Sequence, residues 1–86
     1  MTMTREDAHA LLAHLLGRIA PEVTLEDIGA DEALQEAADL DSMDFLNLMT
    51  AVYEETGIDV PERDYPALAT IAGFEAYLVT ASGHVP

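Results

Sequence analysis

The sequence predicts an all-α domain built as a four-helix bundle. Apolar residues recur at helical spacing in three stretches of the chain, whereas the strict alternation of a β-strand is absent. Residues that favour the start of a helix precede each of these stretches. Four antiparallel helices, one of them short, are the simplest way for 86 residues to bury these apolar stripes.

The first helix is expected to start at Thr4, a good N-cap residue. Glu6 and Asp7 would lie in its first turn, where negative charge is favourable. Pro21 would end it. The apolar residues between them share one face: Ala8, Leu11, Leu12, Leu15, Leu16 and Ile19.

Residues 20–41 form a long acidic connection without clean periodicity. Connections of this length are unusual in a small domain and are often functional. We expect a short helical turn near 31–37. The aliphatic residues expected to hold the connection on the core are Val23, Leu25, Ile28, Leu34 and Leu40.

The second helix is predicted over residues 42–56, with either Asp41 or Ser42 as its N-cap and Gly57 just past its end. At about 100° per residue the helix has two different faces. The predicted inward face contains Phe45, Leu46, Leu48, Met49, Val52, Tyr53 and Thr56. The opposite stripe contains Met43, Asn47, Thr50 and Glu54.

A short turn or helix is predicted over residues 61–66, opened by Pro61 and ended by Pro66. Thr70 would then cap the last helix. Residues 81–86 are expected to fray, which leaves a core of about residues 4–79 in one domain that spans 1–86. The inward residues of the last helix are Ile71, Phe74, Tyr77 and Leu78.

Charge excludes several classes of partner. Seventeen acidic residues against three basic ones give a formal charge of −14, which repels nucleic acid and anionic membranes and favours basic patches on other proteins.

The chain has no cysteine, no apolar run long enough to span a membrane and no N-terminal signal-peptide pattern. A cytoplasmic protein is the resulting expectation.

Ser42 stands at the predicted start of the second helix, near free N–H groups and the positive end of the helix dipole. A phosphoester is favoured at such a position. A free anion is not, because Asp39, Asp41 and Asp44 surround the serine with negative charge. These carboxylates suit a basic partner that installs or uses a group on Ser42, with Met43 as a soft apolar contact. An N-cap serine without any further role is the alternative.

The segment LDSMDFLNLMTAVYEETGIDVPERDYPALATIAGFEAYL resembles the acyl and peptidyl carrier protein family. The motif Asp41-Ser42-Met43-Asp44 is similar to the family's Asp-Ser-Leu/Met signature, and the resemblance covers roughly residues 5 to 79. The register continues without a gap through Glu54-Glu55, Ile58, Val60-Pro61, Thr70-Ile71 and Tyr77-Leu78.

The resemblance implies a carrier-type bundle with a long loop between its first two helices and a short third helix. Ser42 would be esterified by 4′-phosphopantetheine, which a separate transferase takes from coenzyme A. The terminal thiol would carry an acyl or aminoacyl group as a thioester to enzymes with basic docking patches, and the chain, as a monomer, would not be an enzyme. The family's contact positions correspond here to Asp41, Met43, Asp44, Asn47, Thr50, Glu54 and Glu55.

The chain departs from fatty-acid carriers in two respects. Asn47 and Thr50 are neutral where acidic or apolar contact residues are common, and the glycine often found shortly before the serine is missing. These departures suggest a specialised carrier in lipid or secondary metabolite biosynthesis, or one charged with an amino acid. The resemblance also implies a candidate acyl pocket, although plain core packing is the simpler interpretation of its residues. The bulk of Phe74 predicts a limited pocket or none. Its positions are Leu48, Val52, Val60, Leu68 and Phe74.

The residues suggest three alternatives to a carrier. A calcium-binding loop starting at Asp39 fails at Met43, Asp44 and Thr50, so no metal site is expected. An acidic helical adaptor without a prosthetic group shares the fold and charge and stays open. A Ser-His hydrolase is disfavoured because the histidines lie far from Ser42 in sequence, with His9 and His14 expected on the surface of the first helix and His84 in the tail.

Overall fold

The computed structural model describes residues 2–83 of the chain. Within that range the only strand-like contact is an isolated bridge between Ala33 and Thr70. The helices in chain order are α1 (Arg5–Ile19), the 3₁₀ helix η1 (Leu25–Asp27), α2 (Leu34–Ala37), α3 (Ser42–Thr56), the 3₁₀ helix η2 (Glu62–Leu68) and α4 (Ile71–Ser82).

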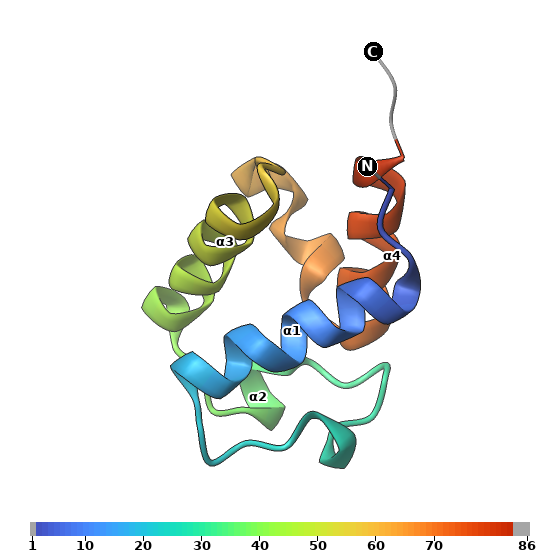
Figure 1. The fold of residues 1–86 in the computed structure, drawn as a ribbon. Helices are drawn as coiled ribbons and strands as arrows, with labels where there is room; N and C mark the ends of the chain where they lie inside the picture. The colour runs from blue at the N-terminus through green and yellow to red at the C-terminus, as the bar shows by residue number, and fades with distance from the viewer. Residues whose placement is uncertain (1, 84–86) are drawn as a thin grey trace.

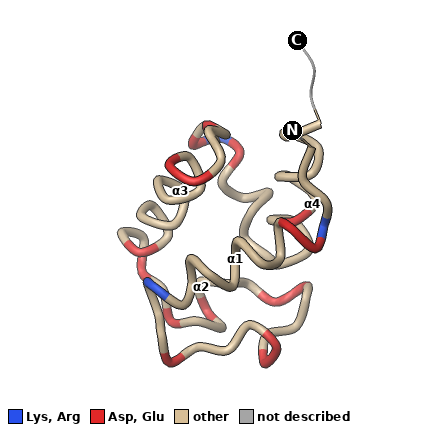
Figure 2. The backbone as a smooth tube through the Cα atoms, viewed as in Figure 1, with Lys and Arg blue, Asp and Glu red and all other residues tan. Residues whose placement is uncertain are grey.

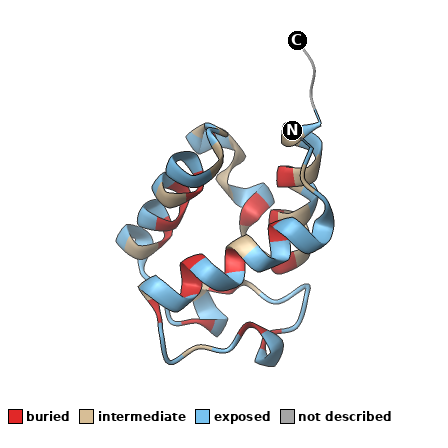
Figure 3. Cartoon of the chain, in the orientation of Figure 1, coloured by how far each residue is buried: buried red, intermediate tan, exposed pale blue. Residues whose placement is uncertain are grey.

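The four longest helices, α1, α3, η2 and α4, form the predicted four-helix bundle. Helix α1 packs against both α3 and α4, and η2 packs against α4. Figure 1 shows α3 and α4 on opposite sides of the molecule, with α1 crossing between them and η2 behind. Buried residues lie on the sides of these helices that face one another (Figure 3). The all-α prediction is therefore confirmed.

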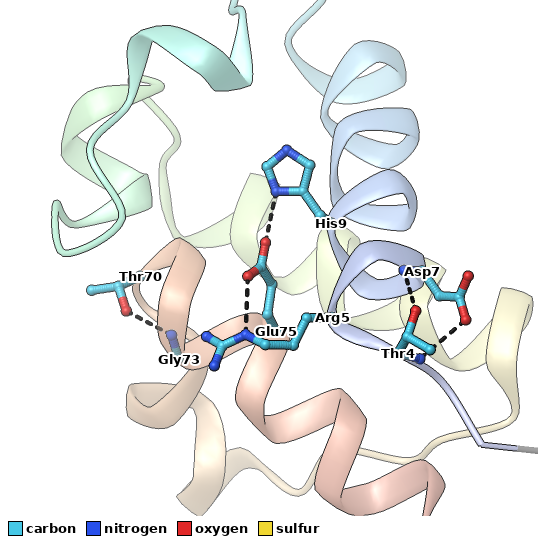
Figure 4. A network of polar contacts seen from close by, with 7 residues as sticks. All are labelled: Thr4, Arg5, Asp7, His9, Thr70, Gly73 and Glu75. Atoms are coloured by element: carbon cyan, nitrogen blue, oxygen red, sulfur yellow. Dashed lines mark hydrogen bonds and ion pairs between the residues drawn. The ribbon is translucent and has the colours of Figure 1, made fainter.

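Side-chain caps fix the starts of α1 and α4. At Thr4 the hydroxyl accepts a hydrogen bond from the Asp7 N–H at 3.1 Å, and the Asp7 carboxylate accepts one from the Thr4 N–H at 3.0 Å (Figure 4). Thr70 accepts from the Gly73 N–H at 3.0 Å. Both N-caps match the predictions from sequence.

The long connection lies on the bundle as expected. Its residues Leu25, Ile28, Leu34 and Leu40 are buried, and the predicted turn is α2. Backbone hydrogen bonds also tie the connection to the start of α4, from the Leu34 N–H to the Ala69 carbonyl at 2.7 Å among others. This connection therefore has a fixed path into α3.

Two boundaries differ from the predictions. η2 does not end at Pro66 but continues to Leu68, because proline lacks only the N–H donor and its carbonyl still accepts from the Ala69 N–H at 3.3 Å. The last helix continues through Ala81 and Ser82, which were expected to fray. Ser82 is held there by the Met3 N–H, which donates to its hydroxyl at 2.8 Å. Residues 84–86, including His84, lie outside the described residues.

The inward face of α3 is narrower than predicted. Leu46 is 43% exposed and Tyr53 is 54% exposed, although both were placed on that face. Each lies one residue beyond a buried position, so each is rotated by about 100° away from the core. The buried residues of α3 are Phe45, Leu48, Met49 and Val52.

A polar contact joins α1 to α4. Glu75 is only 13% exposed, and its carboxylate lies 2.6 Å from the His9 Nδ1 and 3.6 Å from the Arg5 Nε (Figure 4). His9 was expected to be an ordinary surface residue of the helix. It is half-exposed but forms part of this contact, whereas His14 is exposed.

Candidate functional site

Asp41, and not Ser42, is the N-cap of α3. The Asp44 N–H donates to the Asp41 carboxylate at 2.8 Å, and the Asp41 N–H donates to the Asp44 carboxylate at 3.3 Å. These reciprocal bonds form a capping box, which satisfies free N–H groups at the helix start. Ser42 is the first residue of the helix itself and is exposed. Its hydroxyl makes no hydrogen bond to any group within residues 2–83.

The chain has one other serine, and its surroundings are different. The Ser82 hydroxyl accepts from the Met3 N–H at 2.8 Å and donates to the Val79 carbonyl at 3.1 Å. That hydroxyl is part of the structure that holds the N-terminus to α4. Of the two serines, only Ser42 is exposed and has a hydroxyl without a hydrogen bond within residues 2–83.

The backbone just before Ser42 makes a sharp, well-defined turn. The Leu40 N–H donates to the Gln35 carbonyl at 2.8 Å, and the Asp39 N–H approaches the Glu36 carbonyl at 3.4 Å. With Asp39 in the left-handed conformation (φ 53°), these bonds form a Schellman motif at the end of α2. Leu40 is buried immediately afterwards, so the chain is anchored two residues before Ser42.

Sequence reasoning missed this turn. The missing glycine was noted as a departure from the carrier family, but Asp39 adopts the positive φ that a glycine takes most readily. Aspartate is one of the few residues other than glycine that visit this region. An aspartate just after a short predicted helix was the available signal.

A cleft of about 490 Å³ opens beside Ser42 between α2, α3 and η2. Met43 and Leu46 of α3 form an apolar part of its wall, and Gln35 of α2 and Glu62 of η2 contribute polar groups. Phe45 and Tyr65 also line it, with ring centroids 5.7 Å apart and ring planes at 70°. The cleft therefore offers both apolar and hydrogen-bonding surface next to the serine.

The residues predicted for partner contact fall into two groups. Asp41 and Asp44 belong to the capping box, so their carboxylates first hold the helix start. The others are exposed, and Met43 is 64% exposed. They are Met43, Asn47, Thr50, Glu54 and Glu55.

Three of these exposed residues share a shallow groove with α1. Asn47, Thr50 and Glu54 line this groove on the α3 side. Arg18 lines it on the α1 side and lies 3.8 Å from Glu55 through Nη1, a contact that the sequence did not reveal. The Thr50 hydroxyl donates to the Leu46 carbonyl at 3.0 Å. The exposed face of α3 thus combines apolar, neutral and acidic groups.

The five candidate acyl-pocket residues belong to the packed core. All are buried, and none lines the cleft beside Ser42. They are Leu48, Val52, Val60, Leu68 and Phe74. The five residues are thus packed as core side chains, and other residues bound the open volume next to the serine.

Negative charge surrounds Ser42 and continues over much of the surface. Figure 2 shows acidic residues along the connection and at both ends of α3, with few basic positions between them.

Away from this site, burial and a 2.8 Å hydrogen bond to the Asp64 carboxylate raise the pKa of Tyr77 above its ordinary value of 10.0. Within residues 2–83, no three histidine, aspartate or glutamate side chains gather as a metal site would require, and no helix could cross a membrane.

Two comparisons with known proteins identify the family of the chain. Residues 9–78 match the family model described as the phosphopantetheine attachment site. The chain is also 33% identical over 70 residues to an acyl carrier protein of Streptomyces coelicolor, an alignment that covers 81% of this chain and 76% of that protein. The chain therefore belongs to the acyl carrier protein family, whose members are not enzymes but carry acyl groups for enzymes on covalently attached 4′-phosphopantetheine.

Proposed function

We propose that Ser42 is the residue that bears phosphopantetheine, and that the chain serves a specialised biosynthetic pathway rather than the housekeeping fatty acid pathway. In this reaction the Ser42 Oγ attacks the coenzyme A phosphorus atom that bears the pantetheine. An O–P bond forms, the P–O bond of the pyrophosphate breaks, and adenosine 3′,5′-bisphosphate leaves. The hydroxyl proton passes to a base of a separate transferase, because the carboxylates that flank Ser42 in sequence, Asp41 and Asp44, are engaged in the capping box.

One observation carries the proposal. Asp41 takes the N-cap, so the Ser42 hydroxyl is released from the structural role that most often explains a serine at a helix start. It is exposed beside a cleft and held in place by the Schellman turn and the buried Leu40. An exposed hydroxyl on a fixed backbone is what a transferase requires of its acceptor.

The local electrostatics fit a phosphodiester on Ser42. A negative group in the first turn of a helix gains about 0.3–1 kcal/mol from the helix dipole. Asp39 and Asp41, both exposed, act against a free anion at the same place. A covalent bond overcomes this repulsion, and the same carboxylates then attract a basic enzyme. Once attached, the group supplies a thiol that holds the cargo as a thioester.

Partner enzymes are proposed to dock on the exposed face of α3. Met43 provides an apolar contact next to Ser42, and Glu54 and Glu55 provide negative charge further along the helix. Charge of this kind steers a basic partner and aligns it before contact. The chain would act as a monomer in the cytoplasm, where coenzyme A and such enzymes are found.

The specialised pathway is supported by the composition of that face. Asn47 and Thr50 are exposed and uncharged, and Leu46 and Tyr53 add apolar surface between the acidic groups. A partner of this chain must therefore recognise a less acidic helix than a partner of fatty-acid carriers does. An aminoacyl or peptidyl cargo is the second candidate, favoured by the polar groups of the cleft, Gln35 and Glu62.

The test is to incubate the protein with coenzyme A and a broad-specificity phosphopantetheinyl transferase and to measure its intact mass. Wild type and the control Ser82→Ala are expected to gain the mass of one phosphopantetheinyl group, and Ser42→Ala none. Ser82→Ala is a matched control because it removes the chain's other serine. A wild-type protein that gains no mass would favour the unmodified acidic adaptor instead.

A further inference from the structure

We infer that Tyr65, through its contact with Phe45, keeps the cargo in the cleft beside Ser42 and out of the core, so that the chain carries short acyl groups with polar substituents. This inference rests on the proposed attachment at Ser42. It assigns a specificity-determining role to Tyr65 and names the class of cargo.

The contact joins the two elements between which a buried chain would have to pass. Phe45 belongs to the first turn of α3 and Tyr65 to the middle of η2. Their rings meet edge to face at 5.7 Å and 70°, a favoured geometry for aromatic pairs. Both rings also line the cleft, so the pair forms its boundary on the side of the core.

Both α3 and η2 continue from the aromatic pair into the packed core. Leu48, one turn after Phe45, and Leu68, one turn after Tyr65, are each 0% exposed. Val52 is likewise fully buried one turn further along α3. Because protein interiors are close-packed, these fully buried side chains leave no path for an alkyl chain unless they move. A long chain starting from Ser42 would therefore have to separate Phe45 from Tyr65 before it reached the core.

The cleft itself favours a compact polar cargo. Gln35, Glu62 and Tyr65 line it, and their polar side chains make no hydrogen bonds within residues 2–83. A saturated chain laid over these groups would remove them from water without replacing their hydrogen bonds, which is unfavourable. Hydroxyl, keto or amino substituents would supply those bonds, while Met43 and Leu46 contact the hydrocarbon part.

The test compares acetyl, 3-hydroxybutyryl and octanoyl forms of the protein, each transferred from its coenzyme A ester and verified by intact mass. Methyl NMR spectra report where the cargo lies. In the wild type, octanoyl is expected to shift the Met43 and Leu46 methyl signals and to leave those of Leu48, Val52 and Leu68 where they are in the acetyl form. In Tyr65→Ala, octanoyl is expected to shift the core methyl signals and to raise the Tm by several degrees over the acetyl form.

Two further variants separate the ring from other effects. Tyr65→Phe keeps the ring and should exclude the octanoyl chain as the wild type does, but it should lose part of the shift caused by 3-hydroxybutyryl. Tyr77→Phe removes a tyrosine hydroxyl of α4 outside the cleft and should place each cargo as the wild type does. If Tyr65→Ala does not fold, Tyr65→Leu, which keeps apolar volume, replaces it.

Core methyl signals that shift in wild-type octanoyl protein would overturn the inference and leave the proposed function intact. The inference would also be overturned if octanoyl caused the same methyl shifts in the wild type, Tyr65→Ala and Tyr65→Leu. Failure of the wild type to gain mass on Ser42 would instead overturn the proposed function, and this inference with it.

Discussion

Asp41 and Asp44 each accept a hydrogen bond from the other's backbone N–H, at 2.8 and 3.3 Å, on either side of Ser42. This exchange fixes the first turn of α3 through the two carboxylates that flank the serine. The serine is thereby left without a structural task, although its residue type alone suggested an N-cap. The acidic residues of the motif thus act first on the fold and then, as we propose, on partners.

Asp41→Ala should destabilise the protein by about 0.5–2 kcal/mol, because an alanine cannot cap the N–H groups of α3. Asp41→Asn should retain most of the stability, since asparagine also caps. Urea denaturation measures both effects. Asp31→Ala, which removes an exposed carboxylate from the connection, is the control for charge alone. Equal effects of Asp31→Ala and Asp41→Ala would contradict the capping role.

Substitutions of Asp39 should follow the preference for a positive φ. Asp39→Gly should leave stability within about 1 kcal/mol of the wild type, because relief of the left-handed strain and the flexibility of glycine oppose each other. Asp39→Val should cost about 1–2 kcal/mol, since a side chain in this conformation meets the following carbonyl. Thermal melts of the three proteins check the order, and a valine variant as stable as the glycine variant would refute it.

Alkaline pH should reveal the raised pKa of the partly buried Tyr77. Because the pKa of Tyr77 is raised above 10.0 in the folded protein, its contribution to stability is complete below pH 10. That contribution is lost as the pH rises toward the folded pKa, since the unfolded chain ionises first. The wild-type Tm should therefore fall more steeply above pH 10 than that of Tyr77→Phe, which shares the other tyrosines. Parallel curves for the two proteins would contradict this.

The contact of His9 with Glu75 should show measurable coupling between α1 and α4. The Glu75 side chain is 13% exposed and lies 2.6 Å from His9, so a double-mutant cycle of His9→Ala and Glu75→Ala should give a coupling energy of about 0.5–1 kcal/mol. Arg18 and Glu55, both well exposed and 3.8 Å apart, form the matched pair and should give less. The prediction is wrong if the exposed pair couples as strongly.

Local signals explain which parts of the fold were predictable. The limits of α3 follow from Asp41 and Gly57, whose φ of 76° is the left-handed end expected of a glycine. Such signals involve neighbouring residues only. The end of η2 was mispredicted because Pro66 stops an α-helix more readily than it stops a 3₁₀ turn.

The parts that could not be predicted depend on contacts between distant residues. The pairing of Phe45 with Tyr65 brings together α3 and η2, and nothing in either segment alone specifies it. The same holds for Glu75 of α4, a charged residue type usually found exposed, whose side chain is only 13% exposed and contacts His9 and Arg5 of α1. Ser42 was identified through its motif, whereas the shape of the cleft beside it required the packed fold.

The most direct measurement is tandem mass spectrometry of the peptide that contains Ser42, taken from protein purified from its own cells. We predict a phosphopantetheinyl group on that side chain in a substantial fraction of molecules, with Ser82 unmodified in the same sample. Protein whose Ser42 is bare in every molecule, under conditions in which its pathway is active, would contradict the proposal that this exposed hydroxyl is where the chain holds its cargo.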